Sequence, residues 1–293
     1  ENMEIGHNVM HGQWDWMRDP DIHSTTWEWD NVCPADQWKH THNNMHHQWT
    51  NVRGYDADIG YGFFRVDPQQ RHKPDHRFQP LGFIGLALAF EYGVGFHDAM
   101  SQQARLNKRE REQGSGRAIE LPPGCEGGPP VRERVNQTLA KVRSQAFKDY
   151  VAWPVLSVPL GIGSVVSSFT GALAANVVRN VWSFAVIFCG HFPDGAQFFD
   201  PEDVEGESRG EWYRRQVTGS VNFTGGPIMN VASGNLDHQI EHHLFPDLPS
   251  NRYAEIAPRV REICEKHDVQ YNTGSFAHQI GTVVRKIWRL SRP

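Results

Sequence analysis

The sequence predicts an all-α integral membrane protein, in which a bundle of membrane-spanning helices carries a helical cap. Two observations lead to this fold class. From residue 150 to residue 193 the only charged residue is Arg179, and so long a run can supply two spans of about 20 residues each. Histidines also recur four residues apart, as in His7 and His11, which is the spacing that puts two side chains on one face of a helix.

The chain has 293 residues, and no change of composition marks a second unit, so we expect one domain over 1–293. The first histidine pair starts as early as position 7, so most of the helix that carries it is expected to precede the given sequence. We therefore interpret the chain as N-terminally truncated, with N-terminal spans missing. A net charge of −5 argues against a nucleic-acid partner. The four cysteines form no CxxC pair, which favours a reducing compartment.

The uncharged run is predicted to form a transmembrane hairpin with arms at 150–168 and 172–192 and a turn among the glycines and serines of 161–171. A pair of buried helices in a soluble core is the alternative. Because a charge at the bilayer centre is costly, Arg179 must snorkel or face protein. The apolar run 78–89 is too short to span comfortably, so we expect it in the interface or buried in protein.

The remaining segments are expected to be cytoplasmic. Residues 103–148 are rich in Lys and Arg, which favours the cytoplasmic side of an adjoining span. Within them, 131–150 has the spacing of an amphipathic helix and 121–130 has the composition of a loop. The tail 251–287 is predicted to be mostly helical with a break near 272–274. One hairpin between the second and third histidine clusters leaves both on the same membrane face.

The histidine clusters predict a metal site, because neutral imidazole suits iron, zinc and copper. The sequence has no His-Glu-x-x-His motif of a zinc protease, and an iron site of two histidines and one carboxylate needs fewer ligands. So many ligands imply more than one ion, although a non-catalytic metal-binding membrane protein would also use them. The clustered histidines are His7, His11, His42, His46, His47, His238, His242 and His243.

Three motifs resemble, in the same order, the three histidine boxes of the membrane fatty acid desaturase family. They are His7-x3-His11 (box one), His42-x3-His46-His47 (box two) and Gln239-Ile-Glu-His242-His243-Leu-Phe-Pro (box three). The apolar hairpin also lies between the second and third boxes. The likeness is strongest to actinobacterial acyl-CoA desaturases. It rests on three further stretches: Trp38-Lys-His-Thr-His-Asn, Phe188-Cys-Gly-His-Phe-Pro-Asp194 and Leu248-Pro-Ser-Asn-Arg-Tyr-Ala-Glu-Ile256.

The resemblance implies a non-haem di-iron centre, held by the cap at the cytoplasmic membrane face. We expect it to use O2 to place a cis double bond, at Δ9, in a long-chain acyl-CoA or acyl lipid. The resemblance also implies that a separate electron-donor protein, of the ferredoxin or reductase type, supplies two electrons. Relatives use nine histidines, and His191 occupies the position of the ninth. A membrane di-iron hydroxylase of fatty acyl, alkane or carotenoid substrates is the alternative, since it shares iron, O2 and hydrogen abstraction.

Two departures from the family pattern affect individual residues. The third box usually begins with His or Gln at the position of Gln239, so either His238 or Gln239 supplies the ligand. Some relatives carry a water-holding asparagine where Ile187 stands. We expect His40, Asp56 and Asp58 to support the ligands, because metal-bound imidazoles commonly donate to a carboxylate. Tryptophans flank boxes one and two and could line an acyl tunnel or lie at the lipid interface; among them are Trp27, Trp29 and Trp38.

Overall fold

The computed structural model describes residues 5–113 and 129–293, without the side chains of 102–113, and these residues are mostly helical, as predicted. The longer helices are α3 (Gln79–Leu88), α4 (Phe90–Gln113), α5 (Val131–Phe147), α7 (Ile162–His191), α8 (Arg209–Gly219), α11 (Tyr253–Lys266) and α12 (Phe276–Leu290). The shorter ones are α1 (His7–Met10), α2 (Ala35–Trp38), α6 (Trp153–Leu156), α9 (Gly226–Ala232) and α10 (Gln239–Leu244). The predicted loop at 121–130 lies outside the described residues except for its last two positions.

Single turns of other helix types connect these elements. The π-helical segments are η3 (Lys39–His46) and η6 (Lys148–Ala152). The 3-10 turns are η2 (Asp15–Met17), η4 (Ile59–Gly62), η5 (Pro74–Phe78), η7 (Val158–Leu160), η8 (Pro201–Val204), η9 (Leu236–His238) and η10 (Ser250–Arg252). The two strands, β1 (Asn222–Thr224) and β2 (Thr273–Ser275), pair in parallel with Phe223 opposite Gly274. Strand β2 forms the break that was predicted between the two tail helices.

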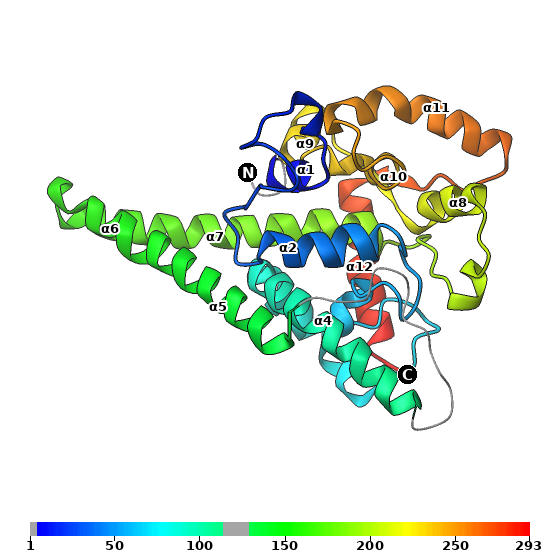
Figure 1. The fold of residues 1–293 in the computed structure, drawn as a ribbon, viewed down its shortest axis with the longest axis horizontal. Helices are drawn as coiled ribbons and strands as arrows, with labels where there is room; N and C mark the ends of the chain where they lie inside the picture. Colours follow the sequence, from blue (N-terminus) through cyan, green and yellow to red (C-terminus); the bar gives the residue numbers. More distant parts are fainter. Residues whose placement is uncertain (1–4, 114–128) are drawn as a thin grey trace.

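A helical hairpin is present where the membrane hairpin was predicted, with different boundaries. Helix α7 is one continuous helix of 30 residues, and it alone among the described helices is long and apolar enough to cross a membrane. Its partner arm is formed by η6, α6 and η7, which pack along α7 and meet it at the tip of a long arm, while the preceding α5 packs against α4 (Figure 1). A bundle with two full spans in this region is therefore not what the structure contains.

The turn lies at Ser157–Gly161 and not among the later glycines. Gly161 has φ +97°, a conformation that only glycine adopts without strain, and it directly precedes α7. The following glycines and serines lie within α7. Near its start, Ser164 Oγ donates to the carbonyl of Leu160, in the preceding turn, at 3.2 Å.

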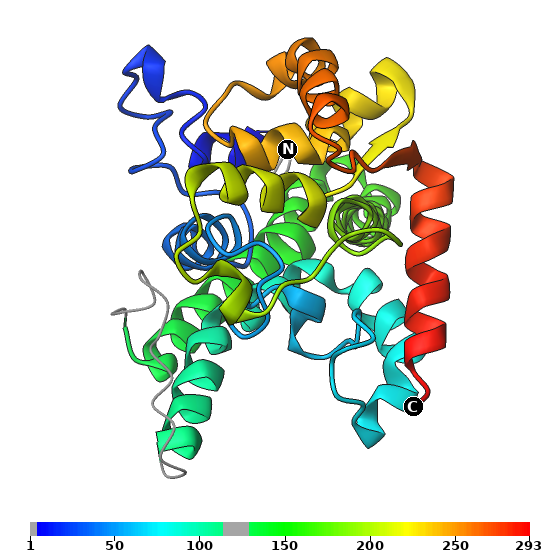
Figure 2. The ribbon, with the colours of Figure 1, turned by 90° about the vertical axis from the view of Figure 1, so that its right-hand side faces the viewer.

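An aromatic core fixes the C-terminal half of α7 in the body of the protein. Phe184 and Phe188 stack with ring centroids 4.0 Å apart, and Phe83 of α3 meets Phe184 edge-on at 4.6 Å. Val283 and Ile287 of α12 pack against the same core, and Figure 2 shows α12 upright beside the end of α7. This packing holds His191, the last residue of α7, at a fixed place.

The single charge of α7 faces protein, as the sequence requires. Arg179 forms an ion pair with Glu91 of α4, and the Glu91 carboxylate also accepts the Val32 N–H at 3.1 Å. Asn180 adds to the contact, since its side-chain oxygen accepts the Glu91 N–H at 3.1 Å. A buried charge that is paired in this way costs far less than an isolated one.

Removing the centre of the aromatic core should destabilise the fold strongly. Phe188 is fully buried, so Phe188→Ala leaves a cavity and should lower the free energy of unfolding by about 3–5 kcal/mol. Phe169 is 44% exposed on the same helix, and Phe169→Ala serves as the matched control with a much smaller loss. Denaturant titration of both variants in detergent measures the difference; equal losses would contradict this account of the core.

A buried lysine should make stability depend on pH. Burial lowers the pKa of Lys286 in α12 from 10.5 to about 8, and its ammonium donates to the Pro193 carbonyl at 2.7 Å. Between these two values the unfolded chain binds more protons than the folded one, so stability rises with pH. We expect a gain of about 2 kcal/mol from pH 8 to pH 10 that disappears in Lys286→Met. Unfolding midpoints at both pH values test this, and a parallel change in the two proteins would refute it.

Candidate metal centre

The second histidine box lies on the π-helical segment η3. In a π-helix each N–H bonds to the carbonyl five residues back, and the His47 N–H reaches the His42 carbonyl at 2.9 Å. This winding brings His42 and His47 together, with their Nε2 atoms 3.2 Å apart. An ordinary α-helix would have paired His42 with His46 alone.

Box one, box two and box three contribute to a first group of imidazoles. His7 of α1 and His11, the residue that ends α1, have ring centroids 4.6 Å apart. His42 lies 5.4 Å from His7, and His242 of α10 lies 4.9 Å from it. The ligand atoms of these four rings all lie within 4.8 Å of one another, a spacing that one metal ion could bridge.

A second group joins the end of α7 to boxes two and three. The rings of His46 and His191 lie 4.6 Å apart, and His243 lies 5.0 Å from each of them. His47 stands between the groups, stacked on His243 at 4.4 Å and 4.5 Å from His11. Eight of the nine predicted ligands therefore form one continuous cluster, and His238 is the ninth.

In several of these rings, one of the two nitrogens is hydrogen-bonded to a neighbouring side chain. His46 Nδ1 donates to the Asp56 carboxylate at 3.0 Å, and His243 Nδ1 meets Gln216 Oε1 at 3.1 Å and Thr50 Oγ1 at 3.2 Å. His242 Nδ1 lies 3.1 Å from the Tyr253 hydroxyl. Such contacts fix the tautomer and leave Nε2 unprotonated, which is the form that binds a metal.

In six of the eight clustered rings, one nitrogen is buried and has no hydrogen-bond partner. A buried polar atom without a partner is costly, so a group of them pointing into one cluster needs an explanation. A bound cation supplies it, because each lone pair becomes a ligand. The donor set, all imidazole and spread over two groups, fits a pair of iron ions. The unpartnered atoms are His11 Nε2, His46 Nε2, His47 Nδ1, His191 Nδ1, His242 Nε2 and His243 Nε2.

Burial keeps most of these rings neutral. Burial, together with nearby imidazoles, lowers the pKa of His7 to about 3, and burial lowers that of His42 to about 4. The same causes hold the pKa of His242 well below its usual value. His46 differs, because Asp56 and Asp58 outweigh the effect of burial and raise its pKa. Neutral imidazole is the ligand form, so a metal would not have to displace protons from most of the cluster.

His238 belongs to neither group. The prediction placed it one helical turn before His242, but α10 begins only at Gln239, and His238 has φ −97° and ψ +54°, outside the helix. Its ring is directed to carboxylates instead, with Nε2 3.9 Å from Asp237 and Nδ1 3.7 Å from Glu241.

Gln239 reaches the cluster where His238 does not. Its Nε2 lies 3.0 Å from His191 Nε2, and its Oε1 is buried without a partner. The side chain crosses the end of α7 so closely that a Cβ on Gly190 would lie 2.8 Å from Gln239 Cγ, so only glycine fits there.

The predicted supporting residues fall on one side of the cluster. Asp56 holds His46 and also accepts the Asn51 N–H at 2.9 Å. Asp58 lies 3.9 Å from Nδ1 of both His42 and His46 and accepts from His97 Nε2 at 3.1 Å. His40 is half-buried on η3 and belongs to neither group of ligands.

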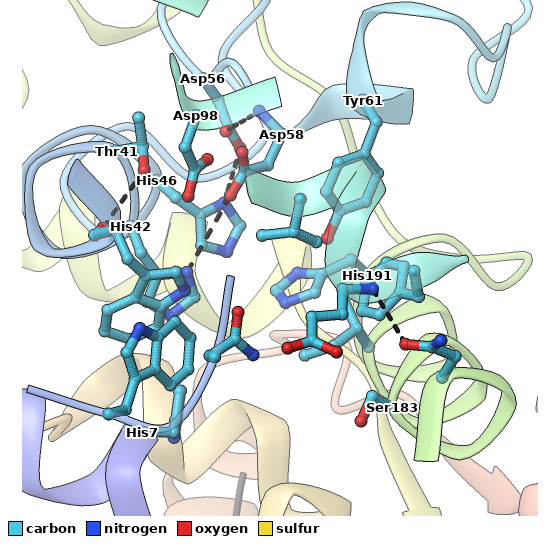
Figure 3. A pocket seen from close by; sticks show the side chains of 18 of the residues that line it. His7, Thr41, His42, His46, Asp56, Asp58, Tyr61, Asp98, Ser183 and His191 are labelled. Atoms are coloured by element: carbon cyan, nitrogen blue, oxygen red, sulfur yellow. Dashed lines mark hydrogen bonds and ion pairs between the residues drawn. The ribbon is translucent and has the colours of Figure 1, made fainter. Parts of the chain in front are cut away.

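A narrow cavity of about 90 Å³ adjoins the cluster. His7, His42, His46 and His191 face it, with Asp58 and Tyr61 along the same wall (Figure 3). From His191 it follows one face of α7, past Ile187 and Ser183 to Arg179 and Asn180; apolar walls come from Trp29, Trp38, Phe90 and Val94. A short stretch of an apolar chain would fit there beside the imidazoles.

Several residues that contact the ligands were not predicted. Tyr253 lies on α11, 11 residues after His242, and Gln216 lies on α8, 27 residues before His243. His97, which contacts the supporting residue Asp58, lacked a clustered partner in the sequence. Tyr253 gave one signal, since it lies in the Leu248–Ile256 stretch that carries the family resemblance. Gln216 and His97 gave none, because only folding brings α8 and α4 to the boxes.

Comparison with known proteins gives a consistent result. The fatty acid desaturase family profile matches residues 2–275. The chain is 48% identical over its full length to the NADPH-dependent stearoyl-CoA 9-desaturase of Mycobacterium tuberculosis, of which it spans 65%. It is 27% identical to an sn-1 linoleoyl-lipid 6-desaturase of Synechocystis and 26% identical to a Delta(5) fatty acid desaturase of Dictyostelium discoideum, with 80% of the chain covered in each case and 60% and 48% of the relatives. No solved structure matches.

Two histidine variants test the composition of the centre. His242→Ala removes a buried candidate ligand and should lower metal affinity by more than about 100-fold, since even loss of a supporting residue costs about 10–100-fold. His238→Ala, four residues away, should leave it nearly unchanged. Metal bound per chain after loading with ferrous iron is measured by elemental analysis, with circular dichroism as the control for folding. Equal loss in both variants would place His238 among the ligands.

Proposed function

The chain belongs to the fatty acid desaturase family, and from this membership we propose that it introduces a cis double bond into a long-chain acyl-CoA, using O2 and a di-iron centre. The observation that carries this proposal is the cluster of eight buried imidazoles, six of which have a buried nitrogen without a hydrogen-bond partner. A structural role for so many unsatisfied atoms would be costly, whereas a redox metal centre uses them all.

The Δ9 position and an acyl-CoA substrate are proposed from the pattern of identities. The relative named stearoyl-CoA 9-desaturase shares 48% of the chain's residues over its full length, while the relatives named 6-desaturase and Delta(5) desaturase share only 27% and 26% over four fifths of it. Because the chain spans 65% of the first relative, the activity of the whole protein remains part of the proposal.

Two iron ions would be held by the two groups of imidazoles. His7, His11, His42 and His242 would hold one ion, and His46, His191 and His243 the other, with His47 between the groups. When bound, the iron pair would supply the activation of O2 that removes two hydrogens from neighbouring methylenes. Gln239, beside His191, would complete the second group or orient it.

The protein's own residues would position the chain and protect the site. Apolar walls beside the cluster, including Trp38 and Val94, would hold methylenes against the imidazoles and exclude water. Fixing the substrate relative to the metal decides which carbons react, so the shape of this cavity would set the double-bond position. Asp56 and Asp58, on one wall of the cavity, would keep the rings of box two in place.

The setting of the reaction is proposed from the rest of the chain. Helix α7 would cross the bilayer, and the basic segment 103–148 would keep the centre on the cytoplasmic face. The two electrons would come from a separate ferredoxin or reductase. This agrees with the word NADPH-dependent in the name of the mycobacterial relative.

Product analysis tests the proposal directly. Membranes containing the protein are incubated with stearoyl-CoA, O2 and an electron-donor system, and the position of the double bond is determined by mass spectrometry. We expect oleoyl product, and none with His242→Ala, because that variant lacks a ligand of the centre.

Other products would identify what is wrong. A double bond at another carbon would contradict the Δ9 assignment alone. An alcohol in place of the alkene would indicate a hydroxylase, which shares the iron, the O2 and the first hydrogen abstraction. Bound metal with no O2 consumption would contradict an enzymatic role.

A further inference from the structure

One tryptophan contacts the metal-ligand imidazoles of two different boxes. The ring of Trp38 stacks on His42 with centroids 4.2 Å apart and planes inclined by only 22°. The same ring meets His7 edge-on at 5.4 Å and His11 at 5.6 Å. Trp38 is 6% exposed, so its indole is part of the interior that encloses the first group of ligands.

Two further tryptophans continue from Trp38 toward the surface. Trp29 lies 5.3 Å from Trp38, ring to ring, and its Nε1 is held by the Cys33 carbonyl at 2.5 Å. Trp27 packs against the same hydrophobic cluster and is half-buried, between exposed Thr26 and Glu28. Trp29 and Trp38 are therefore in ring contact, and Trp27 packs against the same cluster at the partly exposed surface. We call these three residues the tryptophan chain.

Three tryptophans are an unusual choice if these side chains only have to form an apolar wall beside the ligands. Leu, Ile or Phe would fill the space without an indole N–H, and the Nε1 of Trp27 is buried without a partner. Indole is also among the side chains that lose an electron most easily, and electron transfer is fastest between rings in contact. A buried centre that activates O2 needs such a route whenever the oxidant is formed but no substrate consumes it.

We propose that the tryptophan chain carries single electrons inward from the surface to the metal centre, and so removes oxidising equivalents that substrate has not used. The inference rests on the proposed O2-dependent function. Trp38 gives one electron to the oxidised centre and takes one from Trp29, which takes one from Trp27. The external electron donor reduces Trp27, so each passage oxidises the donor by one electron, reduces the centre by one and leaves the indoles unchanged.

The tryptophan chain protects the residues that are closest to the oxidant. His7, His11 and His42 lie against Trp38, and an oxidant that lingers would attack these rings. With the tryptophan chain intact, the damage that occurs should fall on its partly exposed end, at Trp27, instead of on the ligand rings.

Trp38→Phe and Trp38→Tyr separate redox function from packing. Phe and Tyr have nearly the same size, but only the phenol of Tyr is readily oxidised by one electron. Trp182→Phe is the matched control, because Trp182 packs on Phe276 and donates to the Ala232 carbonyl without belonging to the chain. Each iron-loaded protein is given O2 and a reduced ferredoxin without acyl substrate, and oxidised residues are then mapped by peptide mass spectrometry.

In the parent protein and in Trp182→Phe, oxygen addition should concentrate on Trp27 and Trp29. In Trp38→Phe, oxidation of His7, His11 and His42 should rise severalfold and iron should be lost severalfold faster, whereas Trp38→Tyr should restore most of the original pattern. An unchanged map in Trp38→Phe would overturn the proposal, as would equal damage in the Phe and Tyr variants, which would indicate packing alone.

The outcome is separable from that of the proposed function. A protein that consumes O2 but forms no alkene would contradict desaturation and would still give a valid oxidation map. An altered dependence on acyl chain length with an unchanged map would make Trp38 a wall of the substrate cavity only. Iron-loaded protein that consumes no O2 at all would overturn both proposals.

Discussion

Desolvation of eight imidazoles in one interior cluster is the constraint on which the rest of this structure depends. Each ring carries two polar nitrogens, and burial away from water is tolerated only when both find partners. Hydrogen bonds from the fold supply one partner, as Asp56 does for His46 and Tyr253 for His242. The other side is left for a cation, so a bound metal would satisfy the nitrogens that the fold leaves without a partner. Binding energy would then become folding energy.

Meeting that constraint requires elements from the whole length of the chain to end at one point. Helix α7 delivers His191 from its last turn, and the aromatic core around Phe188 prevents that turn from moving. Box three arrives on α10, whose first residue, Gln239, crosses Gly190 at a distance that excludes a Cβ. The long arm of α5, α6 and α7 (Figure 1) is thus anchored at its inner end by the same contacts that build the centre.

Spacing and composition predict which histidines cluster, but the local helix geometry determines how their side chains are arranged. The helical content and the apolar hairpin follow from periodicity and from the lack of charge between 150 and 193. Either His238 or Gln239 was expected to supply a ligand, with His238 on one continuous helix with His242, and the start of α10 at Gln239 leaves His238 outside that helix. The π-helical winding of η3 has no signature in the sequence. The turn was placed among several glycines because only backbone geometry singles out Gly161.

The charges around the cluster suggest why its ligands are all neutral. Carboxylates face only the rings of box two, where Asp58 lies near His42 and Asp56 holds His46. The rings of box three are held by neutral groups, Tyr253 for His242 and Gln216 for His243. Each group of candidate ligands therefore combines one ring near a carboxylate with other rings that are held by neutral groups or by none. A cation bound in either group would keep most of its charge while being stabilised from one side. That arrangement would favour an electron-poor centre, which would suit the proposed abstraction of hydrogen from an unactivated methylene.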